Sequence, residues 1–228
     1  MITVTGLSKS YNGKKVVDDL SFTMKEGKLF ALLGSNGAGK STTIKMMLSL
    51  VKKDGGRIEI PEDALLGYSP ETPYFPPFLT GMEVLLYYGV LQKIPREKLK
   101  EECGTLLHLV GLSEEKTKIK FYSKGMLQRL ALAQAMLGNP SILILDEPCA
   151  GLDAMGRIEM IELIMKLKTA GKTILMNSHI LSDIEKVCDE GMIMQKGKVL
   201  RRFTKEDLRG GESLETIFTK TISGGIEE

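Results

Sequence analysis

The chain has 228 residues, of which 43% are hydrophobic and 26% charged; these ordinary globular values exclude wholesale disorder. That length predicts one main domain with a subdomain rather than two full domains. A net charge of +2 is too small to indicate a nucleic-acid partner, so none is expected. Three widely spaced cysteines favour neither a disulfide framework nor a thiolate metal site and indicate a reducing, cytosolic setting.

Neither a leader nor a membrane span is predicted. Residues 1–5 alternate like a strand and lack the pattern of a signal peptide, so no export is implied. The longest apolar runs, such as Ile142 to Leu145, are far shorter than the roughly 20 residues that span a bilayer. Any membrane role is therefore expected to come through another chain.

The first predicted elements are short strands. A strand at the start of the chain, the Asn12-Gly13 turn and a strand from Val16 to Met24 form a predicted hairpin. Lys28 to Leu33 is a further strand, and it enters a glycine-rich loop. Beyond these strands, from residue 80 to residue 137, the pattern is helical. Thr80, with Glu83 three residues later, predicts a capping box at its start.

Strands return after this helical stretch. They are expected at Ser141 to Leu145, at Thr173 to Met176 and around Met192 to Leu200. Helices alternate with these strands, which predicts a mostly parallel α/β core. The tail has predicted caps at Thr204 and Ser213 and apolar residues at helical spacing, so a docked pair of helices is expected there.

The strongest motif is a glycine-rich loop placed directly after a strand and before a helical run. Such a loop wraps a phosphate chain with inward-pointing N–H groups, and the following helix contributes its positive end. Lys40 is expected to act on the β- and γ-phosphates and the Ser41 hydroxyl to ligate Mg²⁺. The motif predicts binding of a nucleoside triphosphate. Its residues are Gly34, Ser35, Asn36, Gly37, Ala38, Gly39, Lys40, Ser41 and Thr42.

Two carboxylates follow the aliphatic run from Ile142 to Leu145. The run lacks alternation, which is typical of a parallel strand covered on both faces, and ligands of open α/β sheets bind at the carboxyl ends of such strands. Asp146 is expected to hold the hydrated Mg²⁺, and Glu147 to polarise the attacking water as general base. A solvated acidic pair is the alternative, but carboxylates directly after buried aliphatics rarely lack a cation or base role.

A third motif, Tyr122 to Arg129, introduces the helix that runs to Leu137. Taken alone, its Ser-Lys-Gly core is explained about as well by a helix cap at Ser123. Its position between the phosphate loop and the strand that ends at the two carboxylates resembles the ABC ATPase family, in which this octad is the signature loop. The resemblance covers nearly the whole chain. It implies an α/β fold with a P-loop, RecA-like core, a small antiparallel β subdomain and an inserted α-helical signature subdomain.

The resemblance also implies the cofactors ATP and Mg²⁺ and a second ATP-binding subunit, in a homodimer or a heterodimer. In the family the signature loop presents its serine and glycine, here Ser123 and Gly125, to the γ-phosphate bound by the opposite protomer. This again uses the positive end of a helix. Each site is then composite and needs two chains.

Three more positions match site residues of the family, and a fourth differs from it. Tyr11 stands where an aromatic ring stacks on adenine, with a core role as the alternative. Asp153 matches the carboxylate of a loop that crosses the dimer interface, and His179 matches a catalytic histidine that touches the γ-phosphate. Glu71 departs from the pattern, because most members have glutamine there; a carboxylate can still contact Mg²⁺ and the attacking water.

The predicted organisation is a single ABC ATPase domain over residues 1–228. Residues 1–71 and 139–203 form its nucleotide-binding core, residues 72–138 its helical subdomain and residues 204–228 a C-terminal helical tail. The segment from Gly56 to Tyr68 is short for the family, so the β subdomain is expected to be trimmed.

The motifs together predict an ATP-hydrolysing subunit that drives a separate transmembrane permease. Its expected place is cytoplasmic, peripheral on the inner face of the cell membrane. Glu71, Lys124 and the ending around Phe218 resemble the branch that powers type-2 exporters of drugs, lipids or polysaccharides. The loop from Thr72 to Phe78 is apolar and rich in proline and is the candidate docking surface, with a loop tucked onto its own domain as the alternative.

Two other classes of function compete with this interpretation. A soluble ABC ATPase, for example in iron–sulfur cluster assembly, shares all the motifs and stays an alternative. A non-catalytic module that uses ATP only as a clamp would be expected to lack Glu147 or His179, and both are present.

Overall fold

A computed structural model describes residues 1–112, 116–209 and 211–224, and the chain forms two compact units. The first comprises Met1–Asp63 and Thr173–Glu228, and the second Ala64–Lys172. Residues 113–115 of the predicted helical subdomain, and residues 210 and 225–228 of the predicted tail, lie outside the described residues. The helical segment 72–138 thus belongs to the second unit, and the predicted division into core, subdomain and tail stays a prediction.

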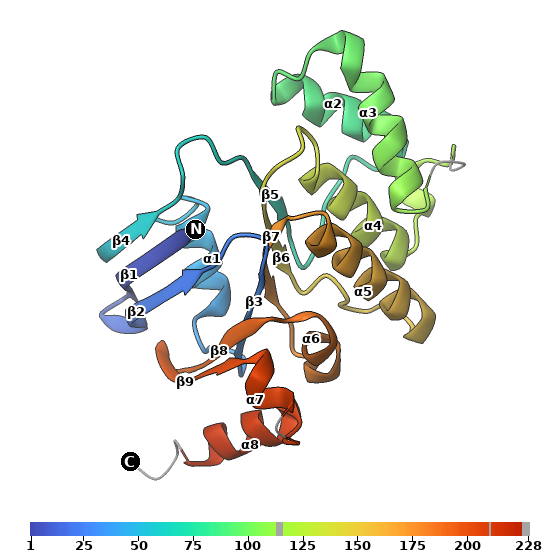
Figure 1. The fold of residues 1–228 in the computed structure, drawn as a ribbon. Helices are drawn as coiled ribbons and strands as arrows, with labels where there is room; N and C mark the ends of the chain where they lie inside the picture. Colours follow the sequence, from blue (N-terminus) through green and yellow to red (C-terminus); the bar gives the residue numbers. More distant parts are fainter. Residues whose placement is uncertain (113–115, 210, 225–228) are drawn as a thin grey trace. The chain divides into compact units, whose positions relative to one another are not determined.

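The first unit contains a three-stranded antiparallel sheet (Figure 1). Its central strand β1 (Ile2–Tyr11) pairs with β2 (Lys14–Met24) on one side and β4 (Gly55–Glu59) on the other. The predicted hairpin is confirmed. Asn12 and Gly13 both have positive φ, 49° and 78°, as a tight turn matched to the twist of the strands requires.

The first unit also holds a group of parallel strands. β3 (Leu29–Gly34) lies between β7 (Thr173–Asn177) and β8 (Glu190–Gln195), parallel to both, and α1 (Lys40–Met47) follows it. All but the last residue of β3 are buried, as expected for a strand covered on both faces. The predicted parallel α/β core is confirmed.

The single strand expected around residues 192–200 was wrong. β8 is followed by an antiparallel partner, β9 (Lys198–Thr204), so this segment is a hairpin. The chain reverses at Lys196 and Gly197, whose φ values of 48° and 83° place both residues in the left-handed region that tight hairpin turns use.

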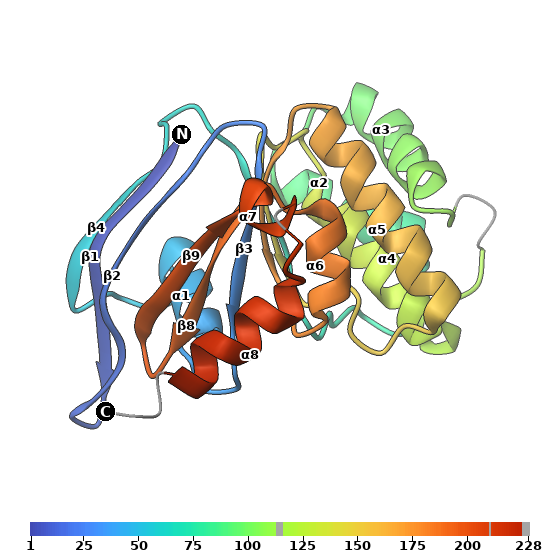
Figure 2. The ribbon, with the colours of Figure 1, turned by 60° about the horizontal axis from the view of Figure 1, so that its bottom comes forward.

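Three helices complete the first unit: α6 (Leu181–Val187), α7 (Lys205–Arg209) and α8 (Leu214–Gly224). Ser213 caps α8, since its Oγ accepts from the Thr216 backbone N–H at 3.2 Å. Leu214 and Ile217 are fully buried. Figure 2 shows α8 beside the β8–β9 hairpin, which it contacts. The predicted pair of docked tail helices is confirmed over its described residues.

The second unit pairs two parallel strands, β5 (Leu66–Ser69) and β6 (Ile142–Asp146), with helices. The helices are α2 (Gly81–Leu91), α3 (Arg96–Leu109), the 3-10 turn η1 (Ile119–Phe121), α4 (Lys124–Ala135) and α5 (Ala154–Thr169). The capping box that opens α2 is confirmed: Thr80 Oγ1 accepts from the Glu83 N–H at 3.3 Å, and Glu83 Oε2 accepts from the Thr80 N–H at 2.7 Å.

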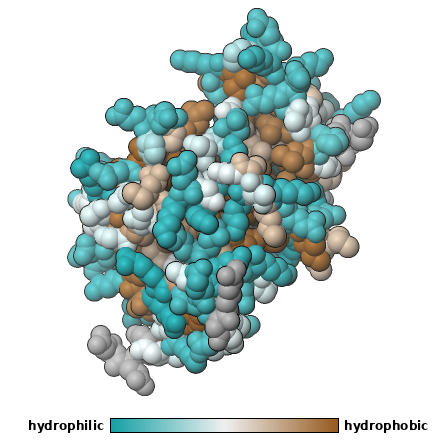
Figure 3. Space-filling view, in the orientation of Figure 1, coloured by the Kyte–Doolittle hydropathy of each residue, from teal (hydrophilic) through white to brown (hydrophobic). Residues whose placement is uncertain are grey.

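Over the described ranges, no helix has both the length and the apolar character needed to cross a bilayer. The face drawn in Figure 3 is mostly hydrophilic, with apolar patches between polar side chains.

Candidate functional site

The glycine-rich loop is shaped by three glycines with positive φ: Gly34 at 155°, Gly37 at 80° and Gly39 at 103°. A side chain at Gly34 would collide with the backbone carbonyl of Met194, and one at Gly39 would lie 2.5 Å from the carbonyl oxygen of Val16. Only glycine can adopt this left-handed backbone conformation at little cost and also leave room for the close approach of the neighbouring strands. The tertiary contacts therefore enforce the loop conformation that the sequence predicts.

The loop ends on the first turn of α1. Lys40 Nζ donates to the carbonyl oxygens of Gly34 at 2.7 Å and Ser35 at 3.2 Å, so its ammonium group lies over the loop. Ser41 is exposed in the same turn. The first turn of a helix presents N–H groups that have no partner within the helix, and together with the helix dipole these attract an anion. The lysine adds a full positive charge. The arrangement suits a phosphate chain.

His179 and Tyr11 belong to the same unit as the loop. β3 and β7 are parallel with Leu32 opposite Asn177, so the glycine-rich loop and His179 follow their strands at the same sheet edge. His179 is exposed. Tyr11 is 45% exposed, and Lys9 Nζ lies 5.3 Å from the centroid of its ring. A core role for Tyr11 does not fit this exposure, whereas stacking on a base does.

The second unit gathers three carboxylates at one strand edge. β5 and β6 are parallel with Ser69 opposite Leu145, so Glu71 leaves β5 at the edge where β6 ends in Asp146 and Glu147. Burial raises the pKa of Tyr68 to about 12, helped by the negative charges of Asp146 and Glu71. Asp146 and Glu71 are thus close enough to Tyr68 for their charges to act on its hydroxyl.

Asp146 and Glu147 are themselves buried, with 5% and 8% of their surface exposed. Glu147 also has a φ of 50°, in the left-handed region that a non-glycine residue occupies only at a cost of about 1–3 kcal/mol. Buried carboxylates and strained backbone concentrate at functional sites. Together they favour a cation or base role over the alternative of a solvated acidic pair.

The motif from Tyr122 to Arg129 is confirmed as a helix start. Ser123 Oγ accepts from the Met126 N–H at 3.2 Å and so caps α4. Asp153 plays the same part for α5, accepting from the Gly156 N–H at 2.7 Å. A Cβ on Gly125 would lie 3.4 Å from Leu152 Cδ2, so the first turn of α4 lies against the loop that carries Asp153.

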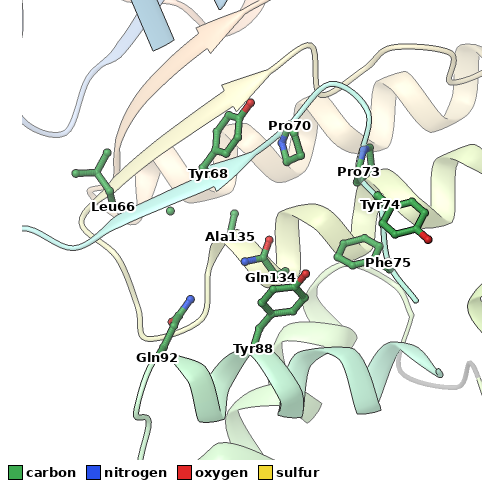
Figure 4. Close-up of a pocket in the computed structure, with 11 residues that line it drawn as sticks. Leu66, Tyr68, Pro70, Pro73, Tyr74, Phe75, Tyr88, Gln92, Gln134 and Ala135 are labelled. Carbon is green, nitrogen blue, oxygen red and sulfur yellow. The ribbon is translucent and has the colours of Figure 1, made fainter. Parts of the chain in front are cut away.

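The loop from Thr72 to Phe78 divides between its two predicted roles (Figure 4). Phe75 is buried and meets Tyr88 edge-on at 6.4 Å between ring centroids. Tyr74 and Phe78 are 83% and 65% exposed. Phe75 and Tyr88 also line a pocket of about 300 Å³ together with Tyr68, Pro73 and Gln134. One part of the loop is therefore tucked onto its own unit, and another part is free to contact a partner.

One residue of this site was missed from the sequence. Gln128 is 1% exposed, and its Nε2 donates to the Glu71 carbonyl at 2.7 Å. The available signal was a polar residue on the apolar side of a helix, in line with Leu132 and Ala135 at i+4 and i+7.

P-loop nucleotide-binding proteins are defined by a strand, a glycine-rich loop and a helix that begins near a lysine. This chain has all three, and its loop contains three glycines with positive φ. A model of the ABC transporter family matches residues 17–150, more than half of the chain. The chain belongs to this family. The predicted family and α/β fold are confirmed.

Individual relatives agree with this assignment. An uncharacterized ABC transporter ATP-binding protein of a Nostoc species is 41% identical over 204 residues, 85% of this chain and 61% of that protein. The bacitracin transport ATP-binding protein of Bacillus licheniformis is 40% identical over 221 residues, 92% of this chain and 71% of that protein. A solved ATP-binding subunit of an ABC transporter has a TM-score of 0.87 at 31% identity, covering 97% of this chain and 99% of its own. The chain thus spans less than two thirds of the length of the Nostoc relative.

Proposed function

We propose that this chain binds ATP with Mg²⁺ and hydrolyses it to drive a transport step. The observation that carries the proposal is the glycine-rich loop, whose left-handed glycines and overlying Lys40 ammonium suit a triphosphate. Lys40 would neutralise charge on the β- and γ-phosphates, and backbone N–H groups of residues 34–42 would hold their oxygens. Tyr11 would stack on adenine, and His179 would contact the γ-phosphate.

The donor set suits Mg²⁺ in a phosphate site. Mg²⁺ prefers oxygen ligands, usually binds one or two protein carboxylates, and completes its shell with phosphate and water. The Ser41 hydroxyl, the Asp146 carboxylate and the exposed Glu71 would hold it. When bound, the ion would neutralise charge on the phosphates.

The base for hydrolysis would be Glu147. Its carboxylate would take a proton from the attacking water. The left-handed backbone conformation of Glu147 sets the direction in which its side chain leaves the strand. Glu71 would help to orient the same water. The products would be ADP and inorganic phosphate.

A second ATP-binding subunit would complete each site. Ser123 and Gly125 at the start of α4 would reach the γ-phosphate held by the opposite protomer, and Asp153 would lie at the interface. Hydrolysis would remove the γ-phosphate, which both chains contact. The closed dimer would then lose the contacts that stabilise it, and it would open. The two subunits would form a homodimer or a heterodimer.

A transmembrane permease would use this opening, and its docking would place the chain on the cytoplasmic face of the membrane. Exposed Tyr74 and Phe78 form the proposed contact. The bacitracin transport relative and the resemblance to the type-2 branch favour an exporter. A soluble role, as in iron–sulfur cluster assembly, would need no such contact.

One experiment tests both halves of the proposal. The tagged chain is produced with a candidate multi-span partner, and phosphate release from ATP is measured with Mg²⁺ and with EDTA, beside the partition of the chain between membrane and soluble fractions. Tyr74→Ser with Phe78→Ser should lower membrane recovery, whereas Tyr87→Ser, at an exposed position on α2 outside this loop, should not. Phosphate release that is unaffected by EDTA would exclude the Mg²⁺-dependent reaction.

A further inference from the structure

The side chain of Gln128 is held in an unusual place for an amide. It lies within the second unit with 1% of its surface exposed, and Nε2 donates to the Glu71 carbonyl oxygen at 2.7 Å. Its Oε1 is buried and has no hydrogen-bond partner among the described residues. A packing role alone would favour an apolar side chain, which would not incur the cost of an unpartnered oxygen. The donor is therefore the reason for an amide at this position.

Two contacts anchor the segment from β5 to Glu71 against α4. The hydrogen bond from Gln128 to Glu71 is one of them. At the other point, a side chain on Gly67 would collide with the carbonyl of Ala135, so β5 and α4 are in close backbone contact there. Gln128 and Ala135 are seven residues apart and lie on one face of the helix. Two turns of helix, about 10 Å, therefore separate the two anchors.

The position of Glu71 depends on the anchor at Gln128. Pro70 precedes it and has no N–H to donate, the residues from 70 to 79 form no regular element, and the Glu71 side chain is exposed. In the described structure, the bond from Gln128 is the one hydrogen bond found at Glu71. α4 begins at its Ser123 cap, five residues before Gln128 or about 8 Å of helix, so continuous backbone hydrogen bonds connect the cap to Gln128.

We infer that Gln128 is a positioning residue that ties the Glu71 main chain to the helix presenting Ser123 and Gly125. The inference rests on the proposed function of Glu71 at Mg²⁺ and the attacking water. The amide sets where the Glu71 carboxylate stands, and it makes that carboxylate follow any displacement of α4. Loss of the bond frees the segment that carries the Glu71 carboxylate and leaves the glycine-rich loop unchanged.

The test is a double-mutant cycle in the full chain, with phosphate release measured across Mg²⁺ concentrations at saturating ATP. Gln128→Met keeps the length of the side chain and removes the donor. We expect kcat to fall and the Mg²⁺ concentration for half-maximal rate to rise, each by roughly two- to tenfold, the factor that one neutral hydrogen bond accounts for. The KM for ATP should change less. After Glu71→Gln, adding Gln128→Met should have little further effect, because both changes act on one group.

Gln134→Met is the matched control, since Gln134 lies on the same helix, half-buried, and makes no bond to Glu71. Gln128→Asn, which keeps the amide but shortens its reach, replaces the methionine variant if that variant does not fold. Effects of Gln128→Met and Glu71→Gln that simply add, or a Gln128→Met profile equal to that of Gln134→Met, would overturn the inference and leave the proposed function standing. A wild-type chain that releases no phosphate would instead refute the proposed function, and this inference with it.

Discussion

The side chain of Lys124 lies over Gly151, so that a Cβ added to Gly151 would meet the end of the lysine. Lys124 and Gly125 lie in the first turn of α4, and Gly151 belongs to the loop that ends at Asp153. This contact and that of Gly125 with Leu152 join the start of α4 to that loop, and both are proposed to face a second subunit. A change in one of them should therefore affect the other.

Gly151→Ala should destabilise the protein. The φ of Gly151 is 70°, a conformation that costs an alanine about 1–2 kcal/mol, whereas the flexible lysine can move away at little cost. We expect a lower melting temperature by circular dichroism and only slight recovery when Lys124→Ala is added. Gly104→Ala is the control, because Gly104 is helical and its Cβ would meet nothing within 4 Å, so this change should be neutral or stabilising. Full recovery by Lys124→Ala would show that the clash, not the strain, dominates.

Lys40→Ala should abolish tight ATP binding, because it removes the side-chain cation that lies over the phosphate loop. Isothermal titration with ATP and Mg²⁺ measures the loss. Lys45→Ala serves as control, since Lys45 is an exposed lysine on the same helix, α1. Equal affinity of wild type and Lys40→Ala would contradict the phosphate-loop assignment.

Tyr11→Ala should weaken ATP binding by about 1–3 kcal/mol, the range for stacking of a base on an aromatic ring, and Tyr11→Phe should bind nearly as the wild type does. The half-exposed ring can reach a base without disturbing the core. Titrations with ATP and with inorganic triphosphate separate stacking from loop damage, because only ATP carries adenine. A loss of equal size for both ligands would place Tyr11 outside the base site.

Glu147→Gln should lower turnover by roughly 10²–10⁴ while ATP binding survives, since the amide keeps the shape of the side chain and cannot take a proton from water. The γ-phosphate then persists, and a closed dimer should accumulate with ATP but not with ADP. Size-exclusion chromatography measures the dimer, and phosphate release measures the rate. Near-normal turnover would remove Glu147 from the base role and make Glu71 the next carboxylate to test.

The capping box of α2 should make stability depend on pH. Hydrogen bonds from the Thr80 backbone and hydroxyl, helped by the charge of Lys118, lower the pKa of Glu83 below its usual 4.5. A lowered pKa stabilises the fold above pH 4.5, and this contribution is lost as the pH falls through the lowered value. Thr80→Ala should cost about 1 kcal/mol at pH 7, and the difference from wild type in thermal unfolding should shrink in acid. Because the alanine variant keeps the backbone bond to Glu83, a difference that is constant with pH would exclude a hydrogen bond from the Thr80 hydroxyl to the charged carboxylate.

Local patterns determined the parts of this protein whose geometry is set within a few residues. The Asn12-Gly13 turn, the capping box at Thr80 and the glycine-rich loop before Lys40 all depend on steric limits and hydrogen bonds between near neighbours. A run of four aliphatics before Asp146 likewise predicts a strand buried on both faces. The family and fold class followed from the order of these signals along the chain.

Contacts between distant residues were decided only by the tertiary structure. Gln128 and Glu71 are 57 positions apart, and nothing in either neighbourhood specifies the other. The hairpin of β8 and β9 was missed because its turn, Lys196-Gly197, interrupts an apolar segment only briefly. The strain at Glu147 depends on how a buried strand continues into the following loop. Packing selects such features from many conformations that the local sequence permits, and so only the folded chain displays them.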